Sequence, residues 1–435
     1  MIIRNKPERD RQQRMLGRKE RIIMEKKLFT RDFTLVVIGQ IISLFGNAAI
    51  RFALPLYLLN QTGSSALYGT VMACAFLPMI LLSPVGGLIA DRVNKRSMMV
   101  ALDFATAGLL LIFMLLHGRM NLVFLLTVTL MLLYGIAGAY QPAVQASIPA
   151  LAVQENFMRA NAVINVISSF ASLLGPVFGG ILYSAYGLLP ILQVCIVCFV
   201  LSAVMEIFIR IPHEKQAGEG SVIGIMRKDF GESIRFIRRE RPVIGKGLVV
   251  VCCVNLFLSA MLNVGLPYLI TEVLPFTEAQ ANRLYGYAEG ALAAGGIVGG
   301  IAAGALAGRL QIRKAGNLLT AAALCVFPMG IVLLCVDSVM AGYLTLTVCC
   351  FAIMTAASVF SVQIMSFVQT ETPQNLVGKV ISVCMMVSMC AQPLGSAMYG
   401  LLFEVCAGYE AVVILFAGVV SLVVAAGARK VFKEI

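Results

Sequence analysis

Four charged residues lie inside long apolar segments of the sequence: Arg51, Asp103, Glu206 and Glu289. An ionisable side chain is costly within a membrane and marks a functional site by default. Arg51 and Glu289 lie at similar depths, so we expect them to pair across a central cavity, where the carboxyl group of Glu289 can carry a proton. A static ion pair, or side chains that reach the outer surface, is the alternative. Asp103 and Glu206 lie near segment ends and are expected to reach the headgroups or a nearby loop; Asp103 is the second candidate for proton coupling.

The sequence lacks the residues that nucleotide hydrolysis, other enzymatic catalysis or metal binding would require. No Walker loop is present to cradle a phosphate, and no Ser/His/Asp or paired-carboxylate constellation lies on a polar segment. Cys195 and Cys198 form one CxxC within an apolar run, without a second pair, and the only histidines are His117 and His213. We therefore expect no enzyme, no cofactor and no metal site, with the cysteines acting as small packing residues.

The elements that carry these residues are predicted to be membrane-spanning helices. Of the 435 residues, 59% are hydrophobic and 13% are charged, and the apolar residues come in blocks of about 20, the length that crosses a bilayer. The sequence predicts an all-α membrane protein with twelve spans, although very short connections at 183–188 and 336–340 also allow eleven. The expected spans are 33–59, 66–90, 97–116, 122–148, 162–183, 188–209, 247–270, 284–307, 316–336, 340–367, 380–403 and 409–428.

The distribution of basic residues predicts the orientation. With the N-terminus inside, 31 of the 34 Lys and Arg residues lie in cytoplasmic segments, and only Arg119 and Arg283 lie outside. Both termini are therefore expected in the cytoplasm, in a multi-pass protein of the cell membrane. The net charge of +12 is attributed to contact with anionic lipids of the inner leaflet, and not to nucleic-acid binding.

The longest polar stretch divides the spans six and six. Within Arg210–Lys246, apolar residues recur at helical spacing among basic ones, which predicts an amphipathic helix on the inner leaflet. The expected organisation is a basic N-terminal segment, a six-helix bundle, a cytoplasmic linker, a second six-helix bundle and a short tail, at 1–32, 33–209, 210–246, 247–428 and 429–435.

The two halves of the sequence repeat. Pro55 in the first span matches Pro267 in the seventh, and Pro176 in the fifth matches Pro393 in the eleventh, at offsets of 212 and 217 residues. Parallel repeats of this kind place a substrate site at their interface near the membrane midplane. The sequence therefore predicts two pseudo-symmetric six-helix bundles with a site between them.

Two motifs resemble signatures of the major facilitator superfamily. The loop after the second span resembles the superfamily's loop between helices 2 and 3, in the residues Gly87, Asp91, Arg92, Lys95 and Arg96. A glycine-rich stretch of the fifth span is similar to the superfamily's antiporter motif, in the residues Gly175, Pro176, Gly179 and Gly180. The resemblance implies that Asp91 and its loop latch the halves by contacting the N-terminus of the eleventh helix. Asn94 replaces the usual glycine of the loop, a position where Asn tolerates a left-handed backbone.

The nearest resemblance is to the proton-dependent efflux group that includes macrolide and siderophore exporters. The fourth span lacks the Arg of the drug-exporter motif, which is a departure from that pattern. In the family that this chain resembles, spans 1, 4, 7 and 10 line the cavity. The polar residues of those spans are therefore candidates for the cavity lining: Gln40, Asn47, Tyr134, Gln141, Asn255, Asn263 and Gln363. Arg51 and Glu289 are candidates as well. The alternative for each amide is a hydrogen bond between helices.

The expected function is secondary active transport by alternating access. A largely apolar cavity suits proton-coupled export of small lipophilic or amphiphilic compounds, by a protein working as a monomer. A lysophospholipid transporter or siderophore exporter of the same fold is one alternative, and a transport-inactive membrane sensor or scaffold is another.

Overall fold

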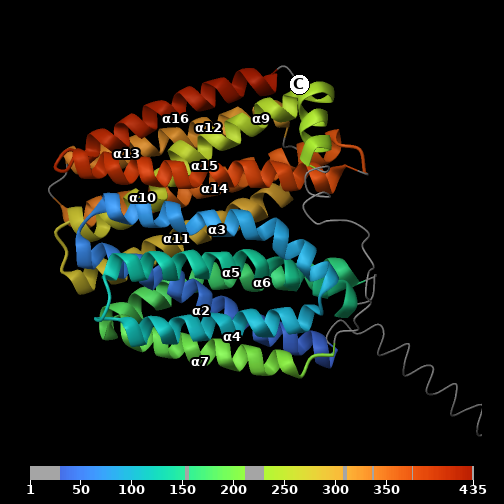
Figure 1. Ribbon diagram of the computed structural model, residues 1–435. Helices are drawn as coiled ribbons and strands as arrows, with labels where there is room; N and C mark the ends of the chain where they lie inside the picture. The colour runs from blue at the N-terminus through green and yellow to red at the C-terminus, as the bar shows by residue number, and fades with distance from the viewer. Residues whose placement is uncertain are drawn as a thin grey trace, which may run out of the picture.

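The computed structural model describes residues 30–151, 156–210, 230–306, 311–335, 338–374 and 376–433, without the side chains of residues 84, 87, 88, 90–92, 149, 150 and 158. All regular structure within these residues is helical (Figure 1). The helices of the first half are α2 (Arg31–Thr62), α3 (Ser65–Arg92), α4 (Lys95–Leu116), α5 (Leu122–Leu151), α6 (Phe157–Tyr186) and α7 (Leu188–Ile207). Those of the second half are α9 (Pro242–Cys253), η3 (Val254–Ser259), α10 (Ala260–Tyr268), η4 (Leu269–Val273), α11 (Glu278–Ala305), η5 (Ile312–Lys314), α12 (Ala315–Leu324), α13 (Val326–Cys335), α14 (Val339–Glu371), α15 (Val377–Val405) and α16 (Glu410–Lys433).

These helices form twelve spans that are long and apolar enough to cross a membrane, which confirms the predicted count. The seventh span, Pro242–Val273, joins α9, η3, α10 and η4, and the ninth joins η5, α12 and α13. The connection at 183–188 does separate two helices, because Gly187 adopts a left-handed φ of 74° between α6 and α7.

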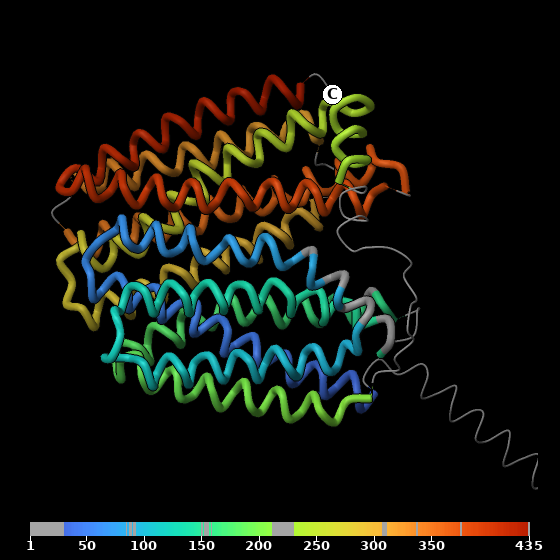
Figure 2. Tube along the Cα trace, in the orientation of Figure 1, coloured from blue at the N-terminus to red at the C-terminus, as the bar shows by residue number. Residues whose placement is uncertain are grey.

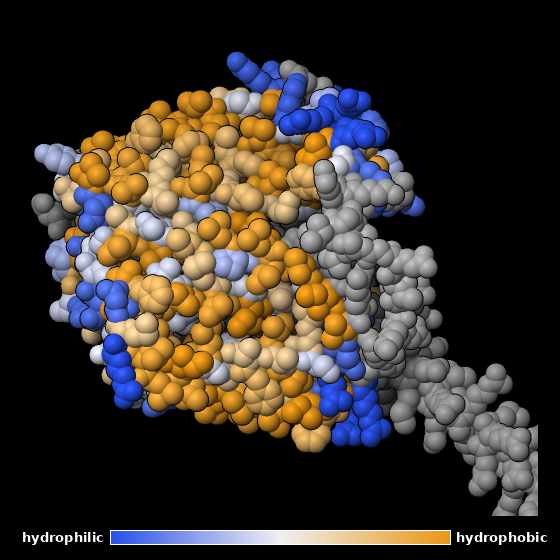
Figure 3. Space-filling model, viewed as in Figure 1, coloured by the Kyte–Doolittle hydropathy of each residue, from blue (hydrophilic) through white to orange (hydrophobic). Residues whose placement is uncertain are grey.

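The outer surface of the bundle is an apolar belt. Figure 3 shows hydrophobic side chains along the middle of the helices and hydrophilic ones gathered at both ends. Large apolar side chains are exposed in both halves, including Leu81, Val197, Ile301 and Val423. A surface of this kind is stable in hydrocarbon, so the chain is a multi-pass membrane protein.

The spans form two bundles that lie side by side (Figures 1 and 2). Helices α2–α7 make the N-terminal half and the helices from α9 onward make the C-terminal half. Across the boundary, α3 packs on α15 and α6 packs on α11. Spans 2 and 5 therefore meet spans 11 and 8, as expected for two pseudo-symmetric bundles.

The residues just before the seventh span pack on the protein. Residues 230–240 are helical, and Phe236 and Ile237 are buried in one cluster with Val368 and Val380 of α14 and α15. The rest of the predicted amphipathic helix, and residues 1–29, lie outside the described residues. Placement of this segment on a membrane surface stays a prediction.

Candidate transport site between the two halves

The two halves are joined at one end of the bundle. We call the end opposite the chain termini the far end; it carries the connection at 62–65. Within the described part of the chain, the hydrogen bonds between the halves all lie toward this end. They include bonds from Asn60 Nδ2 to Asn282 Oδ1 at 2.9 Å, from Ser64 Oγ to Glu404 at 3.0 Å, from Ser65 Oγ to the Gly400 carbonyl at 3.0 Å, from Ser184 Oγ to the Ala279 carbonyl at 2.7 Å, and from Tyr68 OH to the Asn263 carbonyl at 3.5 Å.

Glycine pairs bring the backbones together at the same end. A Cβ atom on Gly286 would lie 2.6 Å from the Pro176 carbonyl oxygen, and one on Gly400 would lie 2.7 Å from the Ser65 carbonyl oxygen. Gly180, opposite Gly286, is equally close-packed, with its Cβ position 2.9 Å from the Asn282 carbonyl. Small residues allow such approach of membrane helices. The structure therefore has its far end closed.

The antiporter-like motif takes part in this closure. Pro176 lies inside α6, and Gly180 faces α11 of the other half. Gly175 and Gly179 instead face Ala48 and Phe52 of α2, within the N-terminal half. The glycines of this motif thus let α6 pack closely on α2 and on α11 of the opposite half.

Glu289 lies at the boundary between the halves and is partly buried. Tyr285, one turn earlier on α11, donates its hydroxyl to Glu289 Oε1 at 3.1 Å. The ring of Tyr285 stacks on Phe52 of α2, with centroids 4.9 Å apart. Tyr68 of α3 lies within electrostatic reach of Glu289 and hydrogen-bonding reach of Tyr285. An acidic side chain of one half is therefore held among aromatic side chains of both.

Arg51 does not pair with Glu289 in this structure, so the predicted ion pair is absent from this state. The Arg51 guanidinium lies over the Tyr134 ring, with Cζ 3.7 Å from its centroid, and Nη2 lies 3.6 Å from Met79 Sδ. Arg51 Nε is buried without a partner. The Tyr134 ring thus interacts with Arg51 in place of the predicted Glu289 carboxylate. An aromatic face attracts a cation in a low-dielectric setting without the cost of burying an anion.

The amides predicted to line the cavity divide into two groups. Asn47 Nδ2 donates to the Ser43 carbonyl at 3.1 Å, and Asn255 Nδ2 donates to the Ser388 carbonyl at 3.0 Å. Gln40 is fully buried inside the N-terminal half, so it does not face the boundary. The side chains of Gln141 and Asn263 are partly buried and that of Gln363 is buried, and none of the three hydrogen-bonds to another described residue. Gln40 and Asn255 thus make hydrogen bonds between helices, as the alternative interpretation held, whereas Asn47 bonds within its own helix α2.

Asp103 and Glu206 are buried in the N-terminal half, so the expectation that they reach the headgroups is wrong. Asp103 is 2% exposed and Glu206 is 0% exposed, because α2, α4, α5 and α7 pack around them. Tyr140 OH donates to Glu206 at 2.8 Å and receives a hydrogen bond from Gln40 Nε2 at 2.6 Å. Tyr140 was not among the predicted site residues. The polar spacing of Gln40, Ser43 and Asn47 on one helix face, and of Ser202 and Glu206 on another, was the signal that could have pointed to this site.

The predicted latch is described only in part. Gly87, Asp91 and Arg92 lie at the end of α3, where the structure describes the backbone but not the side chains of Asp91 and Arg92. Lys95 and Arg96 begin α4 and are partly exposed. Asn94 does not adopt the left-handed backbone: with φ of −60° it is the N-cap of α4, and its side chain accepts from the Arg96 amide at 3.0 Å.

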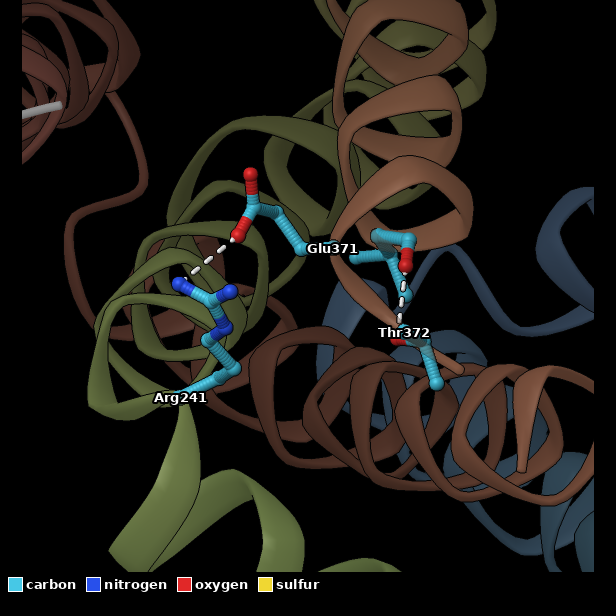
Figure 4. Close-up of polar contacts among 4 residues, drawn as sticks. Arg241, Glu371 and Thr372 are labelled. Carbon is cyan, nitrogen blue, oxygen red and sulfur yellow. Dashed lines mark hydrogen bonds and ion pairs between the residues drawn. The ribbon is translucent and has the colours of Figure 1, made fainter. Parts of the chain in front are cut away.

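Two ion pairs join elements of the C-terminal half at the termini side. Figure 4 shows the Arg241 guanidinium reaching Glu371 at the end of α14, next to Thr372. Arg241 Nη1 lies 3.1 Å from Glu371 Oε2. Lys379 of α15 pairs with Glu232 at 2.9 Å. Both pairs are solvent-exposed in part and so stabilise the fold weakly, but they tie residues 230–241 to α14 and α15.

Twelve spans in two related halves, with contacts between the halves at one end, are the architecture of a membrane transporter. The sequence model of the Major Facilitator Superfamily matches residues 36–396, and the chain belongs to that family. Macrolide efflux protein A of Streptococcus pyogenes is 23% identical over 361 residues, which cover 82% of this chain and 85% of that protein. The multidrug efflux pump Tap of Mycobacterium tuberculosis is 23% identical over 377 residues, covering 84% and 85%.

Solved structures show the same fold. The nucleoside transporter NupG superposes with a TM-score of 0.74 at 13% identity, covering 93% of this chain and 100% of that one. A bacterial homologue of the iron transporter ferroportin, in an inward-facing state, gives a TM-score of 0.67 at 16% identity, covering 91% and 99%.

Proposed function

We propose that this transporter exports small lipophilic or amphiphilic compounds in exchange for protons. The observation that carries the proposal is the position of Glu289, a partly buried acid at the boundary between the halves, surrounded by Tyr68, Tyr285 and Phe52. Aromatic walls suit a lipophilic substrate, and one acid among them can exchange a proton as the site opens. The efflux proteins named among the relatives support the same direction of transport.

The orientation belongs to the same proposal. With both termini in the cytoplasm of a cell-membrane protein, the far end faces outward, and the described state is the inward-facing one. The substrate would then enter from the cytoplasm or inner leaflet and leave when the glycine contacts at the far end separate. Asp91 and its loop would close the cytoplasmic side in the opposite state.

Transport in proteoliposomes tests this proposal. Purified protein is reconstituted in vesicles with an acidic lumen, and accumulation of a macrolide and of a lipophilic cationic dye is followed. Glu289→Gln imitates the protonated acid, so it should abolish gradient-driven accumulation while leaving substrate binding in place. Glu278→Gln is the matched control, an exposed acid on the same helix that should transport normally. Wild-type rates in Glu289→Gln would remove this residue from the mechanism.

A further inference from the structure

A pair of carboxyl groups is buried within the N-terminal half, apart from Glu289. Ser43 Oγ donates to Asp103 Oδ1 at 3.0 Å, and Tyr140 OH donates to Glu206 Oε1 at 2.8 Å. The two carboxyl groups lie close enough to act on each other electrostatically. Two acids that are almost completely inaccessible therefore occupy one site.

Among the described residues, the helices around this site supply polar groups and no cation. Gln40 and Ser43 come from α2, Tyr140 from α5 and Ser202 from α7, where the Ser202 hydroxyl is in hydrogen-bonding reach of Asp103. Tyr140 is the other titratable group that acts on the pair; α3 and α6, which also contact α4 and α7, add none within the described residues. In that part of the chain, neither acid forms an ion pair with a Lys, Arg or His residue.

Three buried oxygen atoms at the site have no hydrogen-bond donor: Gln40 Oε1, Asp103 Oδ2 and Glu206 Oε2. With Tyr140 OH donating to Glu206 and accepting from Gln40 Nε2, the oxygen of the Gln40 amide is left without a donor. Burying two carboxylates without a counter-charge is far costlier than burying a neutral acid, and a bound proton also provides a missing donor.

We propose that Asp103 and Glu206 form a proton-binding site, which holds one proton between them in this far-end-closed state. The proton is carried on one of the two unpaired carboxyl oxygens and donated to a neighbouring acceptor such as Gln40 Oε1. Glu206 lies in the last turn of α7, so the proton can pass to water at the termini side when the surrounding helices move. A proton bound here, away from the substrate, would let Glu289 respond to the substrate while this site responds to the gradient. This last role rests on the proposed function; proton binding itself does not.

Infrared difference spectroscopy of the purified protein tests the binding site without transport. Between acidic and alkaline pH, the wild type should show the carbonyl band of a protonated carboxylic acid in an apolar setting. Asp103→Asn and Glu206→Gln should each remove or shift that band, whereas Glu278→Gln should leave it unchanged. Tyr140→Phe, which keeps the ring in place, removes a donor from the ionised form and should move the midpoint of the band's titration to higher pH.

Transport provides the second readout. Asp103→Asn and Glu206→Gln should lose gradient-driven accumulation at least tenfold and keep substrate exchange at equilibrium. A band that stays unchanged in both variants, or a band that Na⁺ removes at constant pH, would overturn the proton site. If the band changes as expected while the rate of wild-type transport does not depend on the proton gradient, the proton-binding site is supported and the proposed exchange of substrate for protons is wrong.

Discussion

Replacing Gly286 by alanine should open the far end. The new Cβ would lie 2.6 Å from the Pro176 carbonyl oxygen and 3.1 Å from Gly180 Cα, and backbone atoms cannot rotate away as a side chain can. Overpacking of this kind costs about 1–3 kcal/mol. The cost falls only on the closed state, because α6 and α11 part when the far end opens. The equilibrium between the two states should therefore shift about 5- to 150-fold toward the open one.

Distances between spin labels measure this shift. Labels at Leu67 and Leu401, exposed on α3 and α15 in opposite halves, report far-end separation at a site remote from the substitution. The labels require a background without the twelve native cysteines. Gly304→Ala is the matched control, because a Cβ at that position of α11 meets nothing within 4 Å. If Gly286→Ala and Gly304→Ala give the same distance distribution as the parent protein, the glycine contacts do not set the state.

Three further predictions concern Arg51, the Asp91 loop and the topology; the first comes from the structure and the other two come from the sequence. Tyr134→Leu removes the aromatic face under Arg51 and should lower the free energy of unfolding by about 1–2 kcal/mol, measured by thermal unfolding in detergent; an unchanged midpoint would show that the contact contributes nothing. Asp91→Asn should weaken closure of the termini side, slowing transport while substrate affinity, measured by isothermal titration, stays within about twofold; normal transport would leave Asp91 as a topogenic charge. A single cysteine at Glu219 should be protected from an impermeant thiol reagent in intact cells, because the distribution of the basic residues predicts a cytoplasmic linker; labelling from outside would reverse the predicted topology.

The span count and the symmetry were predictable because they depend on properties local to the sequence. Each span is an apolar run of bilayer length, and matched prolines such as Pro176 and Pro393 recur at equivalent depths of the two halves. The contacts of α6 with α11, and of α3 with α15, follow the resulting pseudo-symmetry.

The partners of the charged residues were not predictable in the same way. Depth along a span places Asp103 and Glu206 near membrane ends, but whether they face lipid, water or protein depends on the rotation of α4 and α7, which tertiary packing decides. Arg51 was expected beside an acid and instead lies on Tyr134, a contact that depends on the placement of three helices. A single sequence contains no direct record of such neighbours.

Proton flux driven by substrate tests the central claim most directly. Proteoliposomes with equal pH on both sides and a pH-sensitive dye in the lumen receive a substrate gradient, with a protonophore-treated sample and Glu289→Gln vesicles as controls. Exchange for protons predicts that downhill movement of substrate in one direction drives protons in the other, that the protonophore dissipates the pH change, and that the variant produces none. Substrate movement at normal rates with no change of luminal pH in the wild type would contradict it.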